Sequence, residues 1–106
     1  MNEVEIYMRD SALFVGLNCD IDHHSAKRIR ERVDSDIREF LPKSLILDFS
    51  GVSFMDSSGI GLILGRVAIT EKIGAKVKVS GLSASQMRIF RMAGIEKIKG
   101  VELLLK

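Results

Sequence analysis

The chain has 106 residues, 46% of them hydrophobic and 28% charged, a size and balance that indicate one globular domain with a single core. A net charge of +2 is too small to indicate direct binding to nucleic acid or to a membrane surface. The single cysteine, Cys19, excludes an internal disulfide framework and is compatible with a reducing compartment. Residues 1–5 are acidic and begin no apolar signal segment, so we expect a cytoplasmic protein.

The first elements expected along the chain form a β-hairpin. Apolar and polar residues alternate over residues 4–8, as in a half-buried strand, and Ala12–Leu17 is a second strand candidate. Asp10 and Ser11 between them are turn residues, so the two strands are predicted to pair.

An amphipathic helix is predicted next, with Asp22 or Ser25 as its N-cap and Pro42 just beyond its end. Its apolar residues recur at steps of three and four, namely Ala26, Ile29, Val33, Ile37 and Phe40. Basic residues between 27 and 32 are interleaved with acidic residues farther along the helix, so we interpret them as a solvated face.

The centre of the chain predicts a strand followed by a helix. Residues 44–49 are apolar on both sides, as expected of a central strand covered on both faces of a sheet. After a turn at Gly51, residues 60–73 carry apolar side chains on nearly all faces, which is typical of a buried helix. Gly74 follows as a natural helix stop.

The C-terminal part predicts a strand, a helix and a last short strand. Residues 75–80 alternate, with their lysines toward solvent. Ser83 and Gln86 form a capping box for a helix that ends at Gly94, and residues 95–106 are assigned to the last strand. The order β-β-α-β-α-β-α-β predicts an α/β fold with crossover helices packed on a mixed sheet.

The segment Asp56-Ser57-Ser58-Gly59-Ile60-Gly61 joins the central strand region to the apolar helix and is the candidate site. Asp56 or Ser57 is expected to cap the helix, and from the residues alone a capping role is favoured for Ser57. Ser58 then lies in the first turn, free to accept a phosphate that faces exposed N–H groups and the positive end of the helix dipole. The residues alone leave open which serine carries a phosphate.

Gly59 and Gly61 keep the surface beside Ser58 low, so that the backbone of a partner can approach closely. The alternative for both glycines is close packing of this helix against the sheet, and for Gly61 the two interpretations are about equally favoured. Both alternatives are compatible with the sequence.

Other kinds of site are disfavoured. His23 and His24 are adjacent and diverge on any regular element, with no cysteine or glutamate at ligand spacing, so we expect no metal. Ser58 follows Asp56 where a nucleophile elbow requires glycine two positions earlier. Leu64 occupies the sixth position of a would-be G-x-G-x-x-G, so no dinucleotide cofactor is expected.

Three stretches, residues 21–26, 45–59 and 60–66, resemble the STAS domain family and within it the anti-sigma factor antagonists of the sporulation type. Cys19 and Asp20 depart from the glycine and glutamate that many relatives carry before Ile21. The resemblance implies a single STAS-like α/β domain over residues 1–106, with a small mixed sheet and helices packed mainly on one side.

The resemblance also implies a cycle. The unphosphorylated antagonist binds an anti-sigma factor, itself an ATP-dependent serine kinase, and thereby releases a sigma factor; phosphorylation on the serine matching Ser58 ends the interaction, and a PP2C-type phosphatase restores it. Such an antagonist catalyses nothing and holds no cofactor. The residues implied at the partner surface are Asp22, His23, His24, Asp56, Ser57, Gly59, Ile60 and Gly61. The alternative is a STAS module of another pathway, for stress response or for lipid or transport functions.

Overall fold

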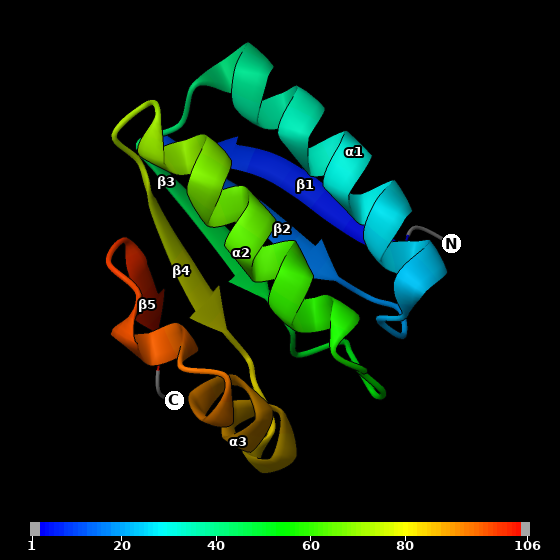
Figure 1. Cartoon of the computed structure of the whole chain (residues 1–106). Helices are drawn as coiled ribbons and strands as arrows, with labels where there is room; N and C mark the ends of the chain where they lie inside the picture. The colour runs from blue at the N-terminus through cyan, green and yellow to red at the C-terminus, as the bar shows by residue number, and fades with distance from the viewer. Residues whose placement is uncertain (1–2, 105–106) are drawn as a thin grey trace.

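The computed structural model describes residues 3–104, which form five strands and three α-helices (Figure 1). In chain order these are β1 (Val4–Arg9), β2 (Ala12–Leu17), α1 (His23–Phe40), β3 (Ser44–Asp48), α2 (Ser58–Glu71), β4 (Lys76–Ser80), α3 (Ala84–Met92), the 3-10 helix η1 (Ile95–Lys97) and β5 (Val101–Leu103). The strands lie in the order β1-β2-β3-β4-β5, with β1 antiparallel to β2 and all other pairs parallel. The predicted mixed α/β fold is confirmed.

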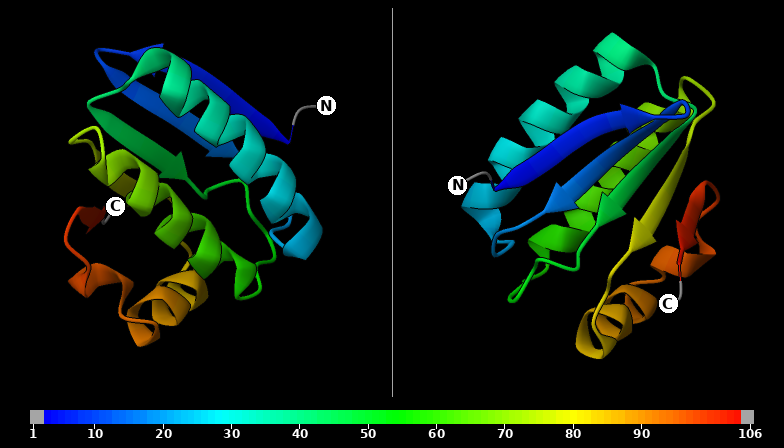
Figure 2. Two further views of the ribbon diagram at one scale, coloured as in Figure 1. Left: turned by 45° about the horizontal axis from the view of Figure 1, so that its top comes forward. Right: turned by 180° about the vertical axis from the view of Figure 1, so that it is seen from behind.

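Helices α1 and α2 cover one face of the sheet, and among residues 3–104 no helix lies over the strands on the opposite face (Figure 2). The prediction that residues 44–49 are covered on both faces is therefore wrong. Leu45 and Leu47 are fully buried beneath the helices, whereas Ile46 on the open face is only half-buried. The open face shields its apolar surface locally, because the rings of Tyr7 and Phe14 stack with their centroids 4.8 Å apart.

The predicted hairpin and the caps of α1 are confirmed. Asp10 and Ser11 both adopt positive φ angles (50° and 69°), the backbone of a tight hairpin turn that suits the right-handed twist of the strands. Asp22 caps α1 by accepting hydrogen bonds from the backbone of His24 and Ser25, and the Ser25 hydroxyl accepts one from the Asp22 N–H. The helix ends where Leu41 turns left-handed.

Helix α2 differs from the prediction of a helix buried all round. Leu62 and Ile63 lie in the core, but the side chain of Leu64 is 41% exposed and Ala68 is exposed as well. Because α1 and α2 form a single layer, the outer face of each helix meets solvent. Gly74, with φ of +72°, completes the turn after α2 as predicted.

Helix α3 lies beyond the carboxyl end of β4 and supports the loop after β3. The predicted capping box of Ser83 and Gln86 is present, and the Gln86 side chain also donates a hydrogen bond to the Val52 carbonyl (3.1 Å). Phe90 packs edge-to-face on Phe49, with ring centroids 5.7 Å apart. These two contacts with α3 fix the loop that leads to α2.

The last predicted strand covers only part of its expected range. The chain first forms η1, in which Ile95 is fully buried, and β5 spans only residues 101–103. Residues 105–106 of the predicted strand lie outside the described part of the chain. Within residues 3–104 no helix is both long and apolar enough to cross a membrane.

Candidate functional site at the start of helix α2

Two loops at the carboxyl edge of the parallel strands are joined by backbone hydrogen bonds. The Ile21 N–H donates to the Phe54 carbonyl (2.9 Å), and the Asp56 N–H donates to the Ile21 carbonyl (3.0 Å). The start of α1 therefore lies directly beside the start of α2. In open α/β sheets this edge is where ligands and partners usually bind. The structure thus brings together the two separate stretches that the sequence singled out.

The prediction that Ser57 caps α2 is wrong. Ser57 occupies the N-cap position, but its backbone is helical (φ −64°, ψ −11°) and its side chain makes no capping hydrogen bond. The Asp56 carboxylate takes that role instead and accepts the Ser58 N–H through Oδ1 at 2.7 Å. Within residues 3–104 neither serine hydroxyl makes a hydrogen bond. Ser57 is exposed and Ser58 is half-buried.

The N–H groups at the start of α2 are also already in use. The Gly59 N–H donates to the Asp56 carbonyl (3.1 Å), and the Ile60 N–H donates to the Ser57 carbonyl (3.0 Å). With the Ser58 N–H held by Asp56, the expectation that a phosphate would face exposed N–H groups is wrong for these three. An anion on Ser58 would instead meet the Asp56 carboxylate close by.

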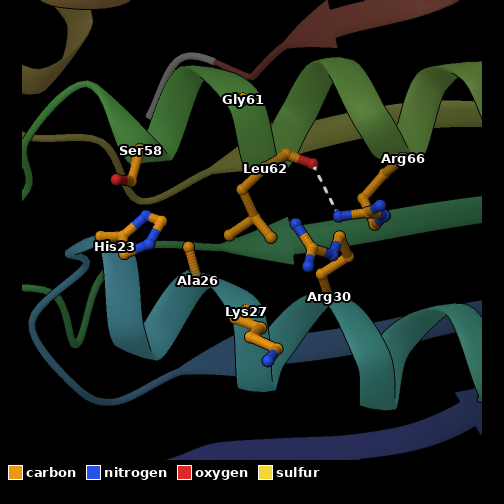
Figure 3. A pocket seen from close by; sticks show the side chains of 8 residues that line it. All are labelled: His23, Ala26, Lys27, Arg30, Ser58, Gly61, Leu62 and Arg66. Atoms are coloured by element: carbon orange, nitrogen blue, oxygen red, sulfur yellow. Dashed lines mark hydrogen bonds between the residues drawn. The ribbon is translucent and has the colours of Figure 1, made fainter.

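A groove runs between α1 and α2 and opens beside Ser58 (Figure 3). Its volume is about 250 Å³, and it is lined by His23, Ala26, Lys27, Arg30, Ser58, Gly61, Leu62 and Arg66. Figure 3 shows the Ser58 hydroxyl on the side of the groove where His23 lies. His24, which is exposed, does not line it. The two adjacent histidines diverge as expected.

Arg66, which lines the groove, belongs to a buried ion pair that the sequence analysis did not identify. Arg66, with 2% of its side chain exposed, places Nε 2.6 Å from Asp34 Oδ1, although this contact lies outside hydrogen-bonding geometry. Its other nitrogens donate to Asp34 Oδ2 (3.1 Å) and to the Leu62 carbonyl (3.2 Å). The sequence held a signal for this ion pair, namely an arginine in the middle of the apolar residues 60–73. A buried guanidinium is rarely found without a carboxylate partner.

Burial dominates the electrostatics of this pair. It lowers the pKa of Arg66, opposed by the attraction of Asp34 and reinforced by the nearby positive charge of Arg30. It also raises the pKa of Asp34, although Arg66 pulls the other way. The pair therefore joins α1 to α2 at a cost in desolvation.

Asp22 stays charged at the N-cap of α1. The backbone N–H of Ser25 is the main cause that holds the pKa of Asp22 below its usual range. Within the described residues no group of three or more His, Cys, Asp and Glu side chains is placed to hold a metal ion.

Gly59 and Gly61 have different surroundings. Gly59 is buried, and a Cβ added there would lie 2.3 Å from the Met55 sulfur. Gly61 is exposed, and an added Cβ would meet no atom within 4 Å. The alternative that Gly61 packs closely against the sheet is therefore wrong. At Gly59, in contrast, an added Cβ would have to displace the Met55 side chain.

Apolar side chains are exposed next to the site. Phe54, in the loop before α2, is 55% exposed, and Leu64 is 41% exposed one turn beyond the half-buried Ile60. Exposed apolar surface beside polar groups is typical of protein interaction sites.

Comparison with known proteins agrees with this arrangement. Residues 3–104 match the family model described as STAS domain. The anti-sigma F factor antagonist of Paenibacillus polymyxa is 30% identical over 91% of this chain and 82% of its own length. The anti-sigma-B factor antagonist of Bacillus subtilis (strain 168) is 27% identical over 90% of this chain and 85% of its own length.

Solved structures give the same result. The anti-sigma factor antagonist SpoIIAA in its unphosphorylated form superposes with a TM-score of 0.76 at 25% identity, over 97% of this chain and 88% of that one. The phosphorylated form of the Bacillus cell fate determinant SpoIIAA superposes with a TM-score of 0.74 at 25% identity, over 97% and 92% of the two chains. The chain belongs to the STAS domain family.

Proposed function

We propose that this chain is an anti-sigma factor antagonist of the sporulation type that is switched by phosphorylation of Ser58. The observation that carries the proposal is the junction of the two loops through Ile21, which places the start of α1 beside two serine hydroxyls without hydrogen bonds within residues 3–104. Relatives named as anti-sigma factor antagonists, among them a protein known in phosphorylated and unphosphorylated forms, support it.

In the proposed cycle the unphosphorylated chain binds an anti-sigma factor in the cytoplasm and displaces the sigma factor. The anti-sigma factor acts as an ATP-dependent serine kinase. The Ser58 oxygen attacks the γ-phosphorus of ATP, ADP leaves, and a base on the kinase takes the hydroxyl proton. A PP2C-type phosphatase then hydrolyses the phosphoserine to serine and inorganic phosphate. The chain itself supplies substrate and binding surface but no catalytic group.

The proposed partner surface comprises the two joined loops and the outward face of α2. Its polar members lie at the two helix starts, and Gly61 leaves an unobstructed surface on α2. Gly59 contributes by allowing α2 to seat against Met55. The proposed contact residues are Asp22, His23, His24, Asp56, Ser57, Ile60 and Gly61, with the buried Gly59 acting through packing alone, and they are flanked by the exposed apolar side chains of Phe54 and Leu64.

A phosphate at this surface changes the charge enough to switch partner binding off. Phosphoserine adds about −1.5 to −2 units of charge at pH 7. Burying an unpaired charged group at an interface costs about 2–5 kcal/mol, which corresponds to roughly a 30- to 4,000-fold loss of affinity. Because the Ser58 hydroxyl makes no hydrogen bond within the described residues, the modification is expected to leave the fold intact.

Mass spectrometry tests the site of modification. The chain is incubated with ATP and the anti-sigma kinase from the same genome, and intact mass and peptide masses are recorded for the wild type, Ser57→Ala and Ser58→Ala. We expect one added phosphate in the wild type and in Ser57→Ala and none in Ser58→Ala. Phosphate retained in Ser58→Ala would assign the switch to another residue, and an unmodified wild type beside an active kinase would refute the phosphorylation switch.

A further inference from the structure

The start of α2 cannot by itself accommodate a phosphoryl group on Ser58. The N–H groups of Ser58, Gly59 and Ile60 already donate to Asp56 and Ser57. The Asp56 carboxylate, 2.7 Å from the Ser58 nitrogen, would repel a second anion. A dianionic phosphate therefore needs positive charge from another element.

Helix α1 presents that charge across the groove. His23, Ala26, Lys27 and Arg30 fall at positions i, i+3, i+4 and i+7, so they share the face of α1 that lines the groove opposite Ser58. Neither Lys27 nor Arg30 has a carboxylate at ion-pair distance within residues 3–104.

The charge inside the groove is unbalanced. No carboxylate is among the residues that line the groove, Asp34 is engaged by the lining residue Arg66, and the positive charge of Arg30 acts on both members of that pair. Ala26 and Gly61 are the small residues of the lining, and the space above Gly61 is empty to 4 Å. A cavity of about 250 Å³ holds a phosphoryl group together with a few waters, since one water occupies about 30 Å³ of the liquid.

We propose that the groove between α1 and α2 is the receiving site for the phosphoryl group of phospho-Ser58, with Lys27 and Arg30 as the cations that hold it. This inference rests on the proposed function, because it requires phosphate on Ser58. It assigns the stabilisation of the phosphorylated state to the facing helix rather than to the start of α2. Because two cations offset part of the charge, the loss of partner affinity falls toward the lower end of the range given above.

The phosphorylated state is therefore stabilised by contacts within the chain itself. A phosphoryl group drawn into the groove leaves the outer surface of α2 and fills the space beside Gly61. It is also shielded from a phosphatase, so Lys27 and Arg30 lengthen the lifetime of the switched-off form.

The test uses phosphoserine incorporated at position 58 during translation, which makes it independent of any kinase or partner. The second ionisation of phosphoserine has a pKa of about 6 and is followed by ³¹P NMR as a function of pH. The wild type is compared with Lys27→Gln/Arg30→Gln, which removes both charges, and with Arg32→Gln, an exposed residue of α1 that does not line the groove. The other titratable groups in and around the groove are the same in all three proteins: His23 and Arg66 in its lining, Asp34 paired with Arg66, Asp56 beside Ser58, and Asp22 at the start of α1.

We expect the phosphate of the wild type and of Arg32→Gln to titrate about one unit lower than that of Lys27→Gln/Arg30→Gln, because an opposite charge within about 4–6 Å shifts a carboxyl pKa by roughly 1–3 units. We also expect a broad-specificity phosphatase to remove phosphate faster from the double variant. Equal midpoints in all three proteins, or an equal change in Arg32→Gln, would overturn the inference. The proposed function is tested separately: it is refuted if the kinase leaves Ser58 unmodified or if the partner binds the phosphorylated and unphosphorylated forms with equal affinity.

Discussion

Replacing Gly61 by alanine is predicted to stabilise the protein while weakening its binding to the anti-sigma factor. Gly61 lies inside α2, and a Cβ added there meets no atom within 4 Å. Alanine is favoured over glycine in a helix interior by about 0.5–1 kcal/mol, and no packing cost opposes this gain. For a domain of this size the gain corresponds to a rise in melting temperature of roughly 2–6 °C.

Gly59→Ala is the matched control, because it makes the same chemical change two residues earlier in the same helix. The added methyl group would lie 2.3 Å from the sulfur and 2.7 Å from Cγ of Met55, whose side chain is 7% exposed. We expect a destabilisation of about 1–3 kcal/mol, as for other overpacked cores. Urea unfolding of both variants measures the two effects.

Gly61→Ala is expected to stabilise the protein and Gly59→Ala to destabilise it, because the two positions of α2 differ in packing. Both results are needed to support this account. A Gly61→Ala protein less stable than the wild type would refute our account of the helix surface. A more stable Gly61→Ala that binds the anti-sigma factor with unchanged affinity, by calorimetry, would remove Gly61 from the proposed partner surface.

Three further predictions concern the ion pair and the loop before α2. Arg66→Met leaves Asp34 buried without its partner and is expected to cost about 3–5 kcal/mol, a loss that the double variant Asp34→Leu/Arg66→Met largely restores in urea unfolding. Burial raises the folded-state pKa of Asp34 and the attraction of Arg66 opposes this rise, so Arg66→Met should raise that pKa further. A group with a raised folded-state pKa contributes stability that is lost as the pH rises through that pKa, so the deficit of Arg66→Met should grow from mildly acidic to neutral pH. A deficit constant with pH would contradict this. Asp56→Ala removes the acceptor of the Ser58 N–H and should lower the free energy of unfolding by about 0.5–2 kcal/mol. Ser57→Ala should change it by less than about 0.5 kcal/mol, because the Ser57 side chain makes no capping hydrogen bond. Equal losses in the two variants would show that Ser57 is the cap after all.

The elements of the fold could be predicted because local signals agreed with one another. The caps at Asp22 and Ser83, the turn at Asp10 and the stop at Gly74 each specify a boundary by backbone chemistry that depends on neighbouring residues alone. The two stretches of the candidate site were also recognisable. Their junction through Ile21 was not, because backbone pairing between distant loops leaves no periodic pattern.

The errors have a common cause, which is the three-dimensional environment of residues that are ambiguous in sequence. Ile46 and Leu64 are apolar but face the open side of the sheet and the outer side of α2, since the helices form one layer. Ser57 has the side chain of a cap, yet its helical backbone leaves Asp56 to accept the hydrogen bond. The solvated face predicted for Arg30 is confirmed, because Arg30 is exposed, but the sequence did not show that it also lines the groove beside Ser58.

The central claim is that phosphate on Ser58 ends the interaction with an anti-sigma factor. Titration calorimetry of the purified anti-sigma factor with the unphosphorylated chain and with the chain carrying phosphoserine at position 58 tests it most directly. We predict that the unphosphorylated chain binds and that phosphate weakens binding by roughly 30-fold or more, at an unchanged fold by circular dichroism. Equal affinity of the two forms would contradict the switch.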